Sequence, residues 1–408
     1  MLDAIYTYIL NYPDELKYLL LLTQRKNTYI STLKFRNDLD QKLFLSLIQK
    51  HKLLPHISKA LNEDQDFFQT NVSPNIKTPD SPFSQELVSR LQTKQKAITK
   101  QMMTLTREMV LLTEELNNKE IPHLFIKGPV LSQLLYDDPF KKDSIDLDLL
   151  IPFEYLEQTH AKLVEKGYRM TYPRFSLNKA QQTINYKISH HYNFFHQQKR
   201  VMIELHWKLI NPYTLLPVPF SELYKNAQTV SLNQYAIKTL SIEDYFLYLA
   251  VHGSKHRWYN LAWLKDFSQL IQISSETTIS KSVTRALRMG FHKPIIQAFI
   301  LSHTLFGTTV PKQIEELYKQ EKHIDSFIMQ ALQAINEPAR SVGSSSGNIT
   351  KLTYNFQLRK RIGYKLTLIF RLRTHHRDWE ILRLPGWLFF LYYPLRPVLF
   401  IIRILKKK

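Results

Sequence analysis

Three carboxylates in the middle of the chain have the clearest chemical potential. Asp146 and Asp148 lie in the segment IDLDLLI, and Glu204 lies in VMIELHW. Residues i and i+2 of a β-strand point to the same face, so Asp146 and Asp148 would project together from an otherwise apolar strand. Two close carboxylates repel each other unless a cation lies between them. Such oxygen ligands suit Mg²⁺ or Mn²⁺, and Glu204 on a second strand would complete a two-metal site.

Each of these residues also has a purely structural interpretation. An Asp-x-Asp pair can face solvent at a strand edge or cap a turn, and Glu204 can be a member of a buried ion pair. These interpretations are less satisfactory for a carboxylate within a strongly apolar strand, because an unpaired buried charge is costly. Both interpretations stay open until the surrounding sequence is considered.

The carboxylates belong to a small β-rich region that begins after a long helix. Apolar residues from Ser84 to about Asn118 recur at steps of three, four or seven, which predicts one long helix with a single apolar stripe. Pro122 ends this pattern. The elements expected after it are a strand at 123–126, a helix at 130–136, a strand at 145–151, a helix at 153–166, and a β-hairpin of 192–195 and 201–206 around the polar turn QQKR.

Helical patterns flank this region on both sides, and polar segments separate them. The segment 62–82 is polar and contains three prolines, and SVGSSSGN is typical of a flexible linker. The predicted organisation is an N-terminal helical region with its linker, 1–82; the long helix with the α/β core, 83–240; a helical domain, 241–340; the flexible linker, 341–348; and a basic, aromatic C-terminal tail, 349–408.

The segment FIKGPVLSQLLYDDPFKKDSIDLDLLIP resembles a bacterial family of uncharacterised nucleotidyltransferases within the DNA polymerase beta-like nucleotidyltransferase superfamily. The residues that match this family in order are Lys127, Gly128, Leu131, Tyr136, Pro139, Lys141 or Lys142, Asp146, Asp148 and Leu149. Later matches are Glu204 to Trp207, the helical segment with His252, Lys255, His256, Trp258, Leu261 and Asp266, and the tail residues Asp378, Leu384, Pro385, Leu395, Arg396 and Pro397. The resemblance covers roughly Glu86 to Pro397.

The resemblance implies a fold and an activity. The fold would be α+β, with a small mixed-sheet nucleotidyltransferase core flanked by N-terminal and C-terminal helical regions. The activity would be transfer of a nucleoside monophosphate from a nucleoside triphosphate to a hydroxyl acceptor by a two-metal mechanism. Asp146 and Asp148 would hold both metals. Glu204 would hold the catalytic metal and help to deprotonate the acceptor.

Two further residues carry over from the family. Gly128 would let the backbone approach the triphosphate, because no Cβ blocks it. Lys127 would contact phosphate, although a lysine at a strand end is often merely solvated. The chain departs from the usual pattern at Pro129, which has no N–H for the triphosphate, and at Glu204, where Asp is commoner in the superfamily.

A pair of histidines, His252 and His256, is spaced i, i+4 on one predicted helix. This is the spacing of a zinc pair, but the sequence HGSKH lacks the glutamate of H-E-x-x-H. The second interpretation is a helix face packed near the cleft. The third is contact between the nucleotide base or phosphates and the side chains of Lys255, His256 and Arg257.

Composition bounds the remaining possibilities. The 408 residues are 44% hydrophobic and contain no Cys, so disulfides and thiolate zinc sites are excluded and a reducing cytoplasm is expected. The segment 349–408 carries 14 Lys or Arg against two acidic residues, a net +12 of the chain's +20. The apolar and aromatic tail would suit an interfacial helix on an anionic membrane surface, which would place the protein at the inner face of the membrane. The alternative is a tail that packs back on the core.

Two other functions compete with catalysis. The fold could persist as a catalytically degenerate binding module, for which Pro129 is the best support. The protein could also be a membrane-surface accessory in envelope polymer or peptide-product assembly, in which residues 350–408 matter more than the metal site. The sequence does not identify the acceptor, and it leaves nucleic acid open as a partner.

Overall fold

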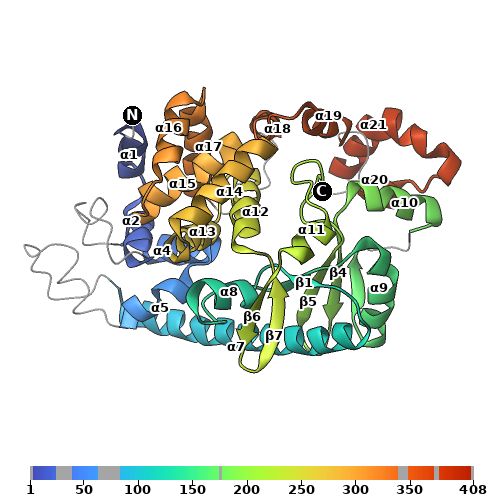
Figure 1. Ribbon diagram of the computed structural model, residues 1–408, viewed down its shortest axis with the longest axis horizontal. Helices are drawn as coiled ribbons and strands as arrows, with labels where there is room; N and C mark the ends of the chain where they lie inside the picture. Colours follow the sequence, from blue (N-terminus) through green and yellow to red (C-terminus); the bar gives the residue numbers. More distant parts are fainter. Residues whose placement is uncertain are drawn as a thin grey trace, which may run out of the picture.

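The structure is a computed structural model that describes residues 3–23, 39–62, 83–173, 177–338, 348–371 and 376–405. The expected loop at 62–82, apart from Asn62, and the expected linker at 341–348, apart from Asn348, lie outside the described residues. The architecture is α+β, as the sequence predicts: one small mixed sheet lies among helices that precede and follow it (Figure 1).

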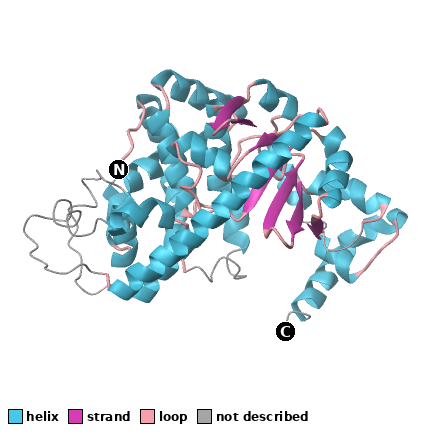
Figure 2. Ribbon diagram, turned by 90° about the horizontal axis from the view of Figure 1, so that it is seen from below, coloured by secondary structure: helices cyan, strands magenta, loops and turns pink. Residues whose placement is uncertain are grey.

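Among the described residues, four short helices and one long helix precede the sheet. They are α1 (Asp3–Leu10), α2 (Asp14–Thr23), α4 (Gln41–His51), α5 (Leu54–Asn62) and α7 (Gln85–Asn118). Ser84 caps the start of helix α7, and its hydroxyl accepts a hydrogen bond from the Leu87 N–H. Its apolar stripe is buried as the periodicity predicts, from Leu87 to Leu116. At about 1.5 Å per residue, its 34 residues span about 51 Å, and Figure 2 shows this helix running across one face of the sheet.

In the described part of the chain, the main sheet has five strands in the order β1-β2-β5-β4-β3. They are β1 (Leu124–Phe125), β2 (Asp146–Leu150), β3 (Arg169–Tyr172), β4 (His191–His196) and β5 (Val201–His206). Strands β2 and β5 are parallel, and the other pairs are antiparallel. The elements between the strands are α8 (Pro129–Tyr136), η1 (Phe153–Tyr155), α9 (Leu156–Glu165) and α10 (Lys179–Ile188). The predicted hairpin around QQKR is the β4–β5 pair.

The two faces of the β2–β5 pair differ in chemistry. Leu147, Leu149, Ile203 and Leu205 are completely buried on one face, which packs against α7. The carboxylates point to the other face, because side chains alternate along each strand. The sequence therefore builds the hydrophobic core and the candidate site from the same two strands.

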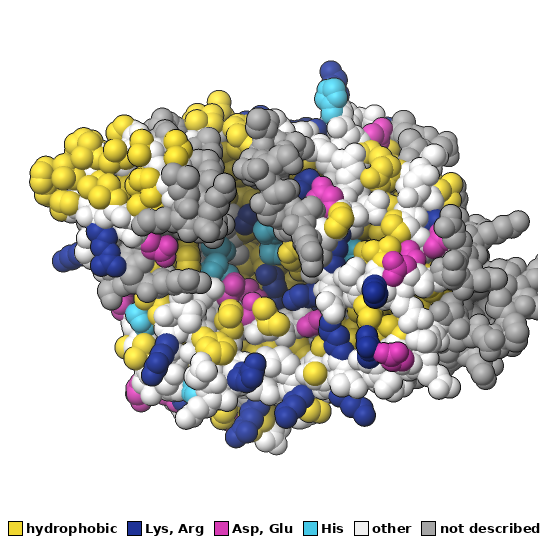
Figure 3. Space-filling view, turned by 180° about the vertical axis from the view of Figure 1, so that it is seen from behind, with side chains coloured by type: hydrophobic (Ala, Val, Ile, Leu, Met, Phe, Trp, Pro, Cys, Tyr) yellow, Lys and Arg dark blue, Asp and Glu magenta, His cyan; other side chains and the backbone are white. Residues whose placement is uncertain are grey.

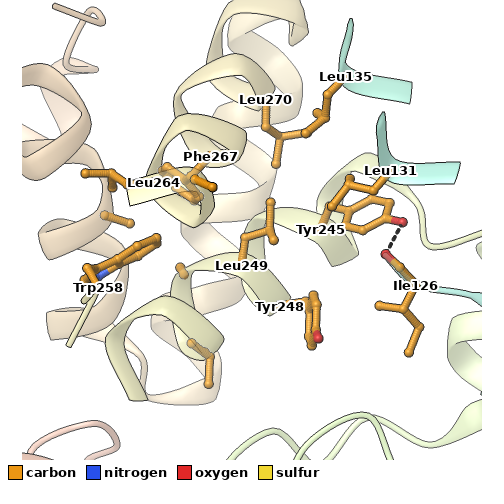
Figure 4. Close-up of a cluster of buried hydrophobic side chains, with 14 of the residues drawn as sticks. Ile126, Leu131, Leu135, Tyr245, Tyr248, Leu249, Trp258, Leu264, Phe267 and Leu270 are labelled. Atoms are coloured by element: carbon orange, nitrogen blue, oxygen red, sulfur yellow. Dashed lines mark hydrogen bonds between the residues drawn. The ribbon is translucent and has the colours of Figure 1, made fainter. Parts of the chain in front are cut away.

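A second, two-stranded sheet and a helical region follow. They consist of α11 (Phe220–Lys225), β6 (Gln228–Leu232), β7 (Tyr235–Thr239), α12 (Ile242–Lys255), α13 (Leu261–Ile273), α14 (Glu276–Met289), α15 (His292–Phe306), α16 (Lys312–Gln320) and α17 (Ile324–Asn336). Figure 4 shows how α12 and α13 dock on α8 through buried apolar side chains. Tyr245 of α12 also donates a hydrogen bond to the carbonyl of Ile126, at 2.7 Å, which ties α12 to the segment after β1.

The C-terminal helices lie along one edge of the molecule (Figure 1). They are α18 (Asn348–Phe356), α19 (Ile362–Arg371), α20 (His376–Ile381), η4 (Gly386–Leu391) and α21 (Tyr392–Leu405). Tyr354 and Tyr364 are buried in the main core, so the first part of the tail packs on the body. A separate small cluster around Trp379 and Tyr392 packs against α10. No described helix combines the length and the apolar character that crossing a bilayer requires.

Candidate active site

Asp146, Asp148 and Glu204 lie on one face of the sheet and line one cavity of about 390 Å³. In the parallel register, Asp148 is directly opposite Glu204, and Asp146 precedes Asp148 by one repeat of the strand. Figure 3 shows the hollow from behind, with acidic, basic and histidine side chains at its centre. The structure thus brings together the three carboxylates that the sequence singles out.

A histidine joins two of these carboxylates. His206 follows Glu204 by two residues, so both side chains point into the cavity. The His206 Nε2 atom lies 3.3 Å from Asp148 Oδ1 and 3.2 Å from Glu204 Oε2. The neighbouring strand adds His191, whose Nε2 is 3.9 Å from Glu204 Oε1. One imidazole from β5 and one from β4 therefore lie beside Asp148 and Glu204.

The three carboxylates do not share one electrostatic environment. Burial and the charges of Asp148 and Glu204 raise the pKa of Asp146 to about 7. Burial alone would also raise the pKa of Asp148, but Lys127 and the His206 imidazole outweigh it and hold the pKa below its usual value. For Glu204, hydrogen bonding and charge from His206 likewise outweigh burial and lower the pKa. The cluster thus has two ionised carboxylates and a third, Asp146, whose charge Lys127 and Lys52 compensate only in part.

His206 and His191 respond to this cluster in opposite ways. Burial alone would lower the pKa of His206, but its hydrogen bonds to Asp148 and Glu204 raise that pKa to about 9. For His191, burial and the charge of His206 lower the pKa to about 4. At neutral pH and without a bound cation, His206 is therefore the positive partner of the carboxylates, and His191 is neutral.

Lys127 and Gly128 form the turn between β1 and α8. The Lys127 Nζ atom lies 3.5 Å from Asp148 Oδ1 and 5.5 Å from the centre of the Tyr248 ring. This lysine therefore points into the cavity. Gly128 has a φ of +67°, which favours glycine, and an added Cβ would lie 3.5 Å from the Asp146 carbonyl oxygen. The positive φ of this turn therefore favours glycine, whereas the space beside the strand that carries the carboxylates would admit a Cβ in ordinary contact.

Pro129 is the first residue of α8. The first N–H groups of a helix have no intrahelical partner, so a proline at this position removes only a donor that the helix does not use. The N–H groups of Val130 and Leu131 are the next donors at this helix end. Pro129, where the chain departs from the superfamily pattern, therefore removes one backbone N–H donor from the turn. The N–H groups of Val130 and Leu131 are left.

Four lysines line the cavity together with the carboxylates: Lys52, Lys127, Lys142 and Lys255. They come from the N-terminal helices, the turn after β1, the segment before β2 and the end of α12. Lys142 also donates to the Asp266 carboxylate of α13, and Tyr136 donates to the same carboxylate at 3.0 Å. This buried network ties the segment before β2 to the helical region, which fixes one wall of the cavity.

His252 and His256 lie on the same wall as Lys255. Their rings are 4.9 Å apart, and the His252 ring packs edge-on to Trp263, also at 4.9 Å. Burial and nearby lysines lower the pKa of both histidines, to about 3 for His256. Within the described part of the chain, neither histidine belongs to a cluster of three or more groups that could hold a metal ion. The arrangement favours a neutral, aromatic cavity wall over a zinc pair.

The structure also reveals site residues that the sequence analysis assigned no role. Among the described residues, two groups have ligand atoms within 4.8 Å of one another: Asp148, Glu204 and His206, and the trio His190, His191 and His206. Asp146 is in neither group. The two-residue spacing from Glu204 to His206 could have indicated their shared face. The contributions of Lys52 and His191 depend on how distant segments pack, and no local pattern indicates them.

A family model described as an uncharacterised nucleotidyltransferase matches residues 37–307, which is more than half of the chain. No curated protein shows significant similarity to the chain. The matched span contains all the residues that line the cavity, and it ends before the C-terminal tail.

Proposed function

We propose that this chain, which belongs to a family of uncharacterised nucleotidyltransferases, transfers a nucleoside monophosphate from a nucleoside triphosphate to a hydroxyl group of an acceptor. One observation carries the proposal: β2 and β5 present Asp146, Asp148 and Glu204 to a cavity that is also lined by four lysines. Carboxylates hold divalent cations, and lysines neutralise the phosphates that such cations bridge.

The donor set fits divalent cations. Oxygens of Asp148 and Glu204 lie close together, and the carboxyl group of Asp146 has a raised pKa because burial and its neighbours disfavour its charge. A cation at this position would favour ionised Asp146. Mg²⁺ or Mn²⁺ held by these residues would lower the pKa of the acceptor hydroxyl and stabilise the leaving pyrophosphate.

The chain's own residues position the reaction. The acceptor oxygen attacks the α-phosphorus, a new P–O bond forms, and the bond from that phosphorus to the bridging oxygen of pyrophosphate breaks. Glu204 accepts the proton of the hydroxyl. Lys127 and Lys255 balance the charge of the triphosphate, and Gly128 lets the backbone approach it. His256, which is neutral, forms a hydrogen bond with the base or a phosphate.

The experiment follows the nucleotide. The purified protein is incubated with each labelled nucleoside triphosphate, Mg²⁺ or Mn²⁺, and a cell lysate, and both pyrophosphate release and labelled products are measured. We expect one class of labelled acceptor with the wild type and none with Asp146→Asn. Binding of nucleotide without pyrophosphate release, for every nucleotide and both metals, would favour the degenerate binding module instead.

A second proposal concerns the C-terminal tail, which we infer to contact an anionic membrane surface. Figure 3 shows apolar side chains gathered at the corner of the molecule formed by the C-terminal helices. Trp387 is 76% exposed and Phe390 is 59% exposed, and Val398 and Ile401 of α21 are exposed as well. Exposed aromatic and aliphatic groups next to a net charge of +12 suit the interface of an anionic bilayer.

The vesicle experiment uses full-length chains, because Tyr354 and Tyr364 pack into the main core and truncation would uncover apolar surface. The double variant Trp387→Ser, Phe390→Ser is compared with Met103→Ser, which changes an exposed apolar residue of α7. We expect binding to phosphatidylglycerol-containing vesicles at low salt, weaker binding at high salt, and a loss only in the double variant. Equal binding to pure phosphatidylcholine vesicles, or equal retention of both variants, would contradict the proposal.

A further inference from the structure

His206 occupies a position between two of the candidate metal ligands. This residue is only 4% exposed, and its Nε2 atom faces both Asp148 Oδ1 and Glu204 Oε2. The backbone fixes this arrangement, because His206 and Glu204 share one face of β5 and Glu204 is paired with Asp148 of β2. The imidazole therefore belongs to the same cluster as the carboxylates.

The distances within this cluster also suit shared coordination of one cation. Charge-assisted N–H···O hydrogen bonds are usually about 2.7–2.9 Å long. The His206 Nε2 atom is instead 3.3 Å from the Asp148 oxygen and 3.2 Å from the Glu204 oxygen. Two ligand atoms that each lie about 2.1 Å from one cation are about 3.0 Å apart at a right angle and about 3.4 Å apart at a tetrahedral angle. Both observed separations fall between these values.

We propose that His206 Nε2 is a ligand of the cation held by Asp148 and Glu204, and that the site therefore selects a first-row transition ion, represented by Mn²⁺, over Mg²⁺. The inference rests on the metal site of the proposed function and specifies the chemistry of that site. Imidazole nitrogen suits transition ions, whereas Mg²⁺ prefers oxygen ligands and keeps several waters. A set of ligand atoms that includes an imidazole nitrogen therefore suits Mg²⁺ less well than Mn²⁺ at this position.

His191 has a different role in this arrangement. Its Nε2 is 3.9 Å from Glu204 Oε1, and its Nδ1 is 3.2 Å from His190 Nε2. It lies beside the second oxygen of Glu204, away from the oxygen that faces His206. The nitrogen ligand is therefore assigned to His206, and His191 is a neighbour of the other oxygen of Glu204.

The test binds Mn²⁺ alone to the full-length protein. The dissociation constant is measured from the free Mn²⁺ signal in electron paramagnetic resonance, and pulsed measurements detect nitrogen coupled to the bound ion. The variants are His206→Asn, His191→Gln and the matched control His160→Gln. His160 packs on the opposite face of β4, against Tyr192 and Phe194. Thermal unfolding shows that each variant is folded, and His206→Gln replaces His206→Asn if the latter is not.

We expect nitrogen coupling in the wild type, in His160→Gln and in His191→Gln, and none in His206→Asn. The affinity for Mn²⁺ should fall by at least about 10- to 100-fold in His206→Asn, and the affinity for Mg²⁺ by less. Three outcomes would overturn the assignment. They are nitrogen coupling that persists in His206→Asn, coupling that disappears only in His191→Gln, and no coupling in the Mn²⁺-bound wild type.

The same proteins separate this inference from the proposed function. Pyrophosphate release by a wild type whose bound Mn²⁺ shows no nitrogen coupling would leave nucleotidyl transfer in place and overturn the histidine ligand. Nitrogen coupling from His206 without transfer of any nucleotide would support the ligand and contradict the proposed reaction.

Discussion

The two faces of the β2–β5 pair have the same backbone and opposite chemistry. On one face Leu149 and Ile203 are completely buried against α7. On the other face Asp148 and Glu204 line a cavity with His206 between them. The first face stabilises the fold through burial of apolar surface, and the second concentrates charges that the fold must compensate. Substitutions on the two faces should therefore separate loss of stability from loss of activity.

The largest effect is expected for the Asp pair. Asp146→Asn and Asp148→Asn should each abolish nucleotidyl transfer, because each removes a charged oxygen ligand. Their stabilities without metal should differ. The raised pKa of Asp146 marks a disfavoured charge, so Asp146→Asn should unfold at an unchanged or higher temperature. Asp148→Asn leaves Lys127 and His206 without their shared anion and should unfold at a lower temperature.

These two variants are compared by pyrophosphate release with Mn²⁺ and by melting in a chelator. Full activity in both would show that the polar face of the sheet is not the active site. A lower melting temperature for Asp146→Asn would show that its charge is compensated in the folded protein.

Glu204→Ala should lower the rate by at least about two orders of magnitude, the usual scale for a lost acid–base group. The rate constant at saturating nucleotide is the measurement, and Glu204→Gln serves as the isosteric comparison. A wild-type rate in both variants would leave Glu204 as a structural partner of His206 and would reduce the site to Asp146 and Asp148.

The pH dependence of stability distinguishes a buried histidine of the N-terminal helices, His51 of α4, from His206 at the site. Burial, and next the charge of Lys50, hold the pKa of His51 well below its usual value, and this side chain is completely buried. Below pH 6.5 the unfolded chain gains a proton that folded His51 does not accept. The free energy of unfolding should therefore fall by about 2 kcal/mol between pH 7 and pH 5 from this residue alone.

His206 should change the free energy of unfolding with pH in the opposite direction. Its raised folded pKa, about 9, gives stability that is fully present below about pH 6.5 and is lost as the pH rises through about 9. The free energy of unfolding is measured with denaturant, in the presence of a chelator, at pH 5, 7 and 9. It should change less between pH 7 and pH 5 in His51→Gln than in the wild type, and less between pH 7 and pH 9 in His206→Asn. Identical profiles for wild type and His51→Gln would contradict the neutral state of that histidine.

The smallest effect is expected on the apolar face. Ile203→Val removes one buried methyl group and should cost about 0.5–1.5 kcal/mol of unfolding free energy. The rate constant per folded molecule should stay at the wild-type value, because the side chain points toward α7 and away from the cavity. A clear change in rate with unchanged stability would show that the two faces are coupled more closely than their separation by the sheet suggests.

The periodicity of apolar residues and the spacing of the carboxylates predicted the helices and strands that carry the site. The apolar stripe predicted α7, alternation placed Asp146 and Asp148 on one face, and the resemblance predicted the family that the family model confirms. The pairing of β2 with β5 was not predictable in the same way, because 50 residues separate their ends and the register depends on tertiary packing. The β6–β7 hairpin was also missed, since its turn at Asn233 lacks the glycine that marks such turns.

The cavity itself was the least predictable feature. Lys52 reaches it from the N-terminal helices, and Trp263 reaches it from α13, so its lining comes from segments more than 200 residues apart. Single-sequence patterns describe neighbours along the chain and contain no information about such contacts. The two-residue spacing of Glu204 and His206 indicates a shared face, but the approach of His206 to Asp148 requires the parallel register.

The length of α7 has a consequence for how this protein can change by insertion or deletion. Its first half packs against α5, and its second half is joined to the sheet region through the ion pairs of Glu108 with Lys199 and of Glu115 with Lys162. One inserted residue would rotate everything beyond it by about 100°, and seven would nearly restore the rotational phase. Those seven would still move the Lys52 side of the cavity about 10 Å from the carboxylates. No such insertion preserves both the rotation and the length of the helix. The length of α7 therefore sets the distance between the two walls of the cavity.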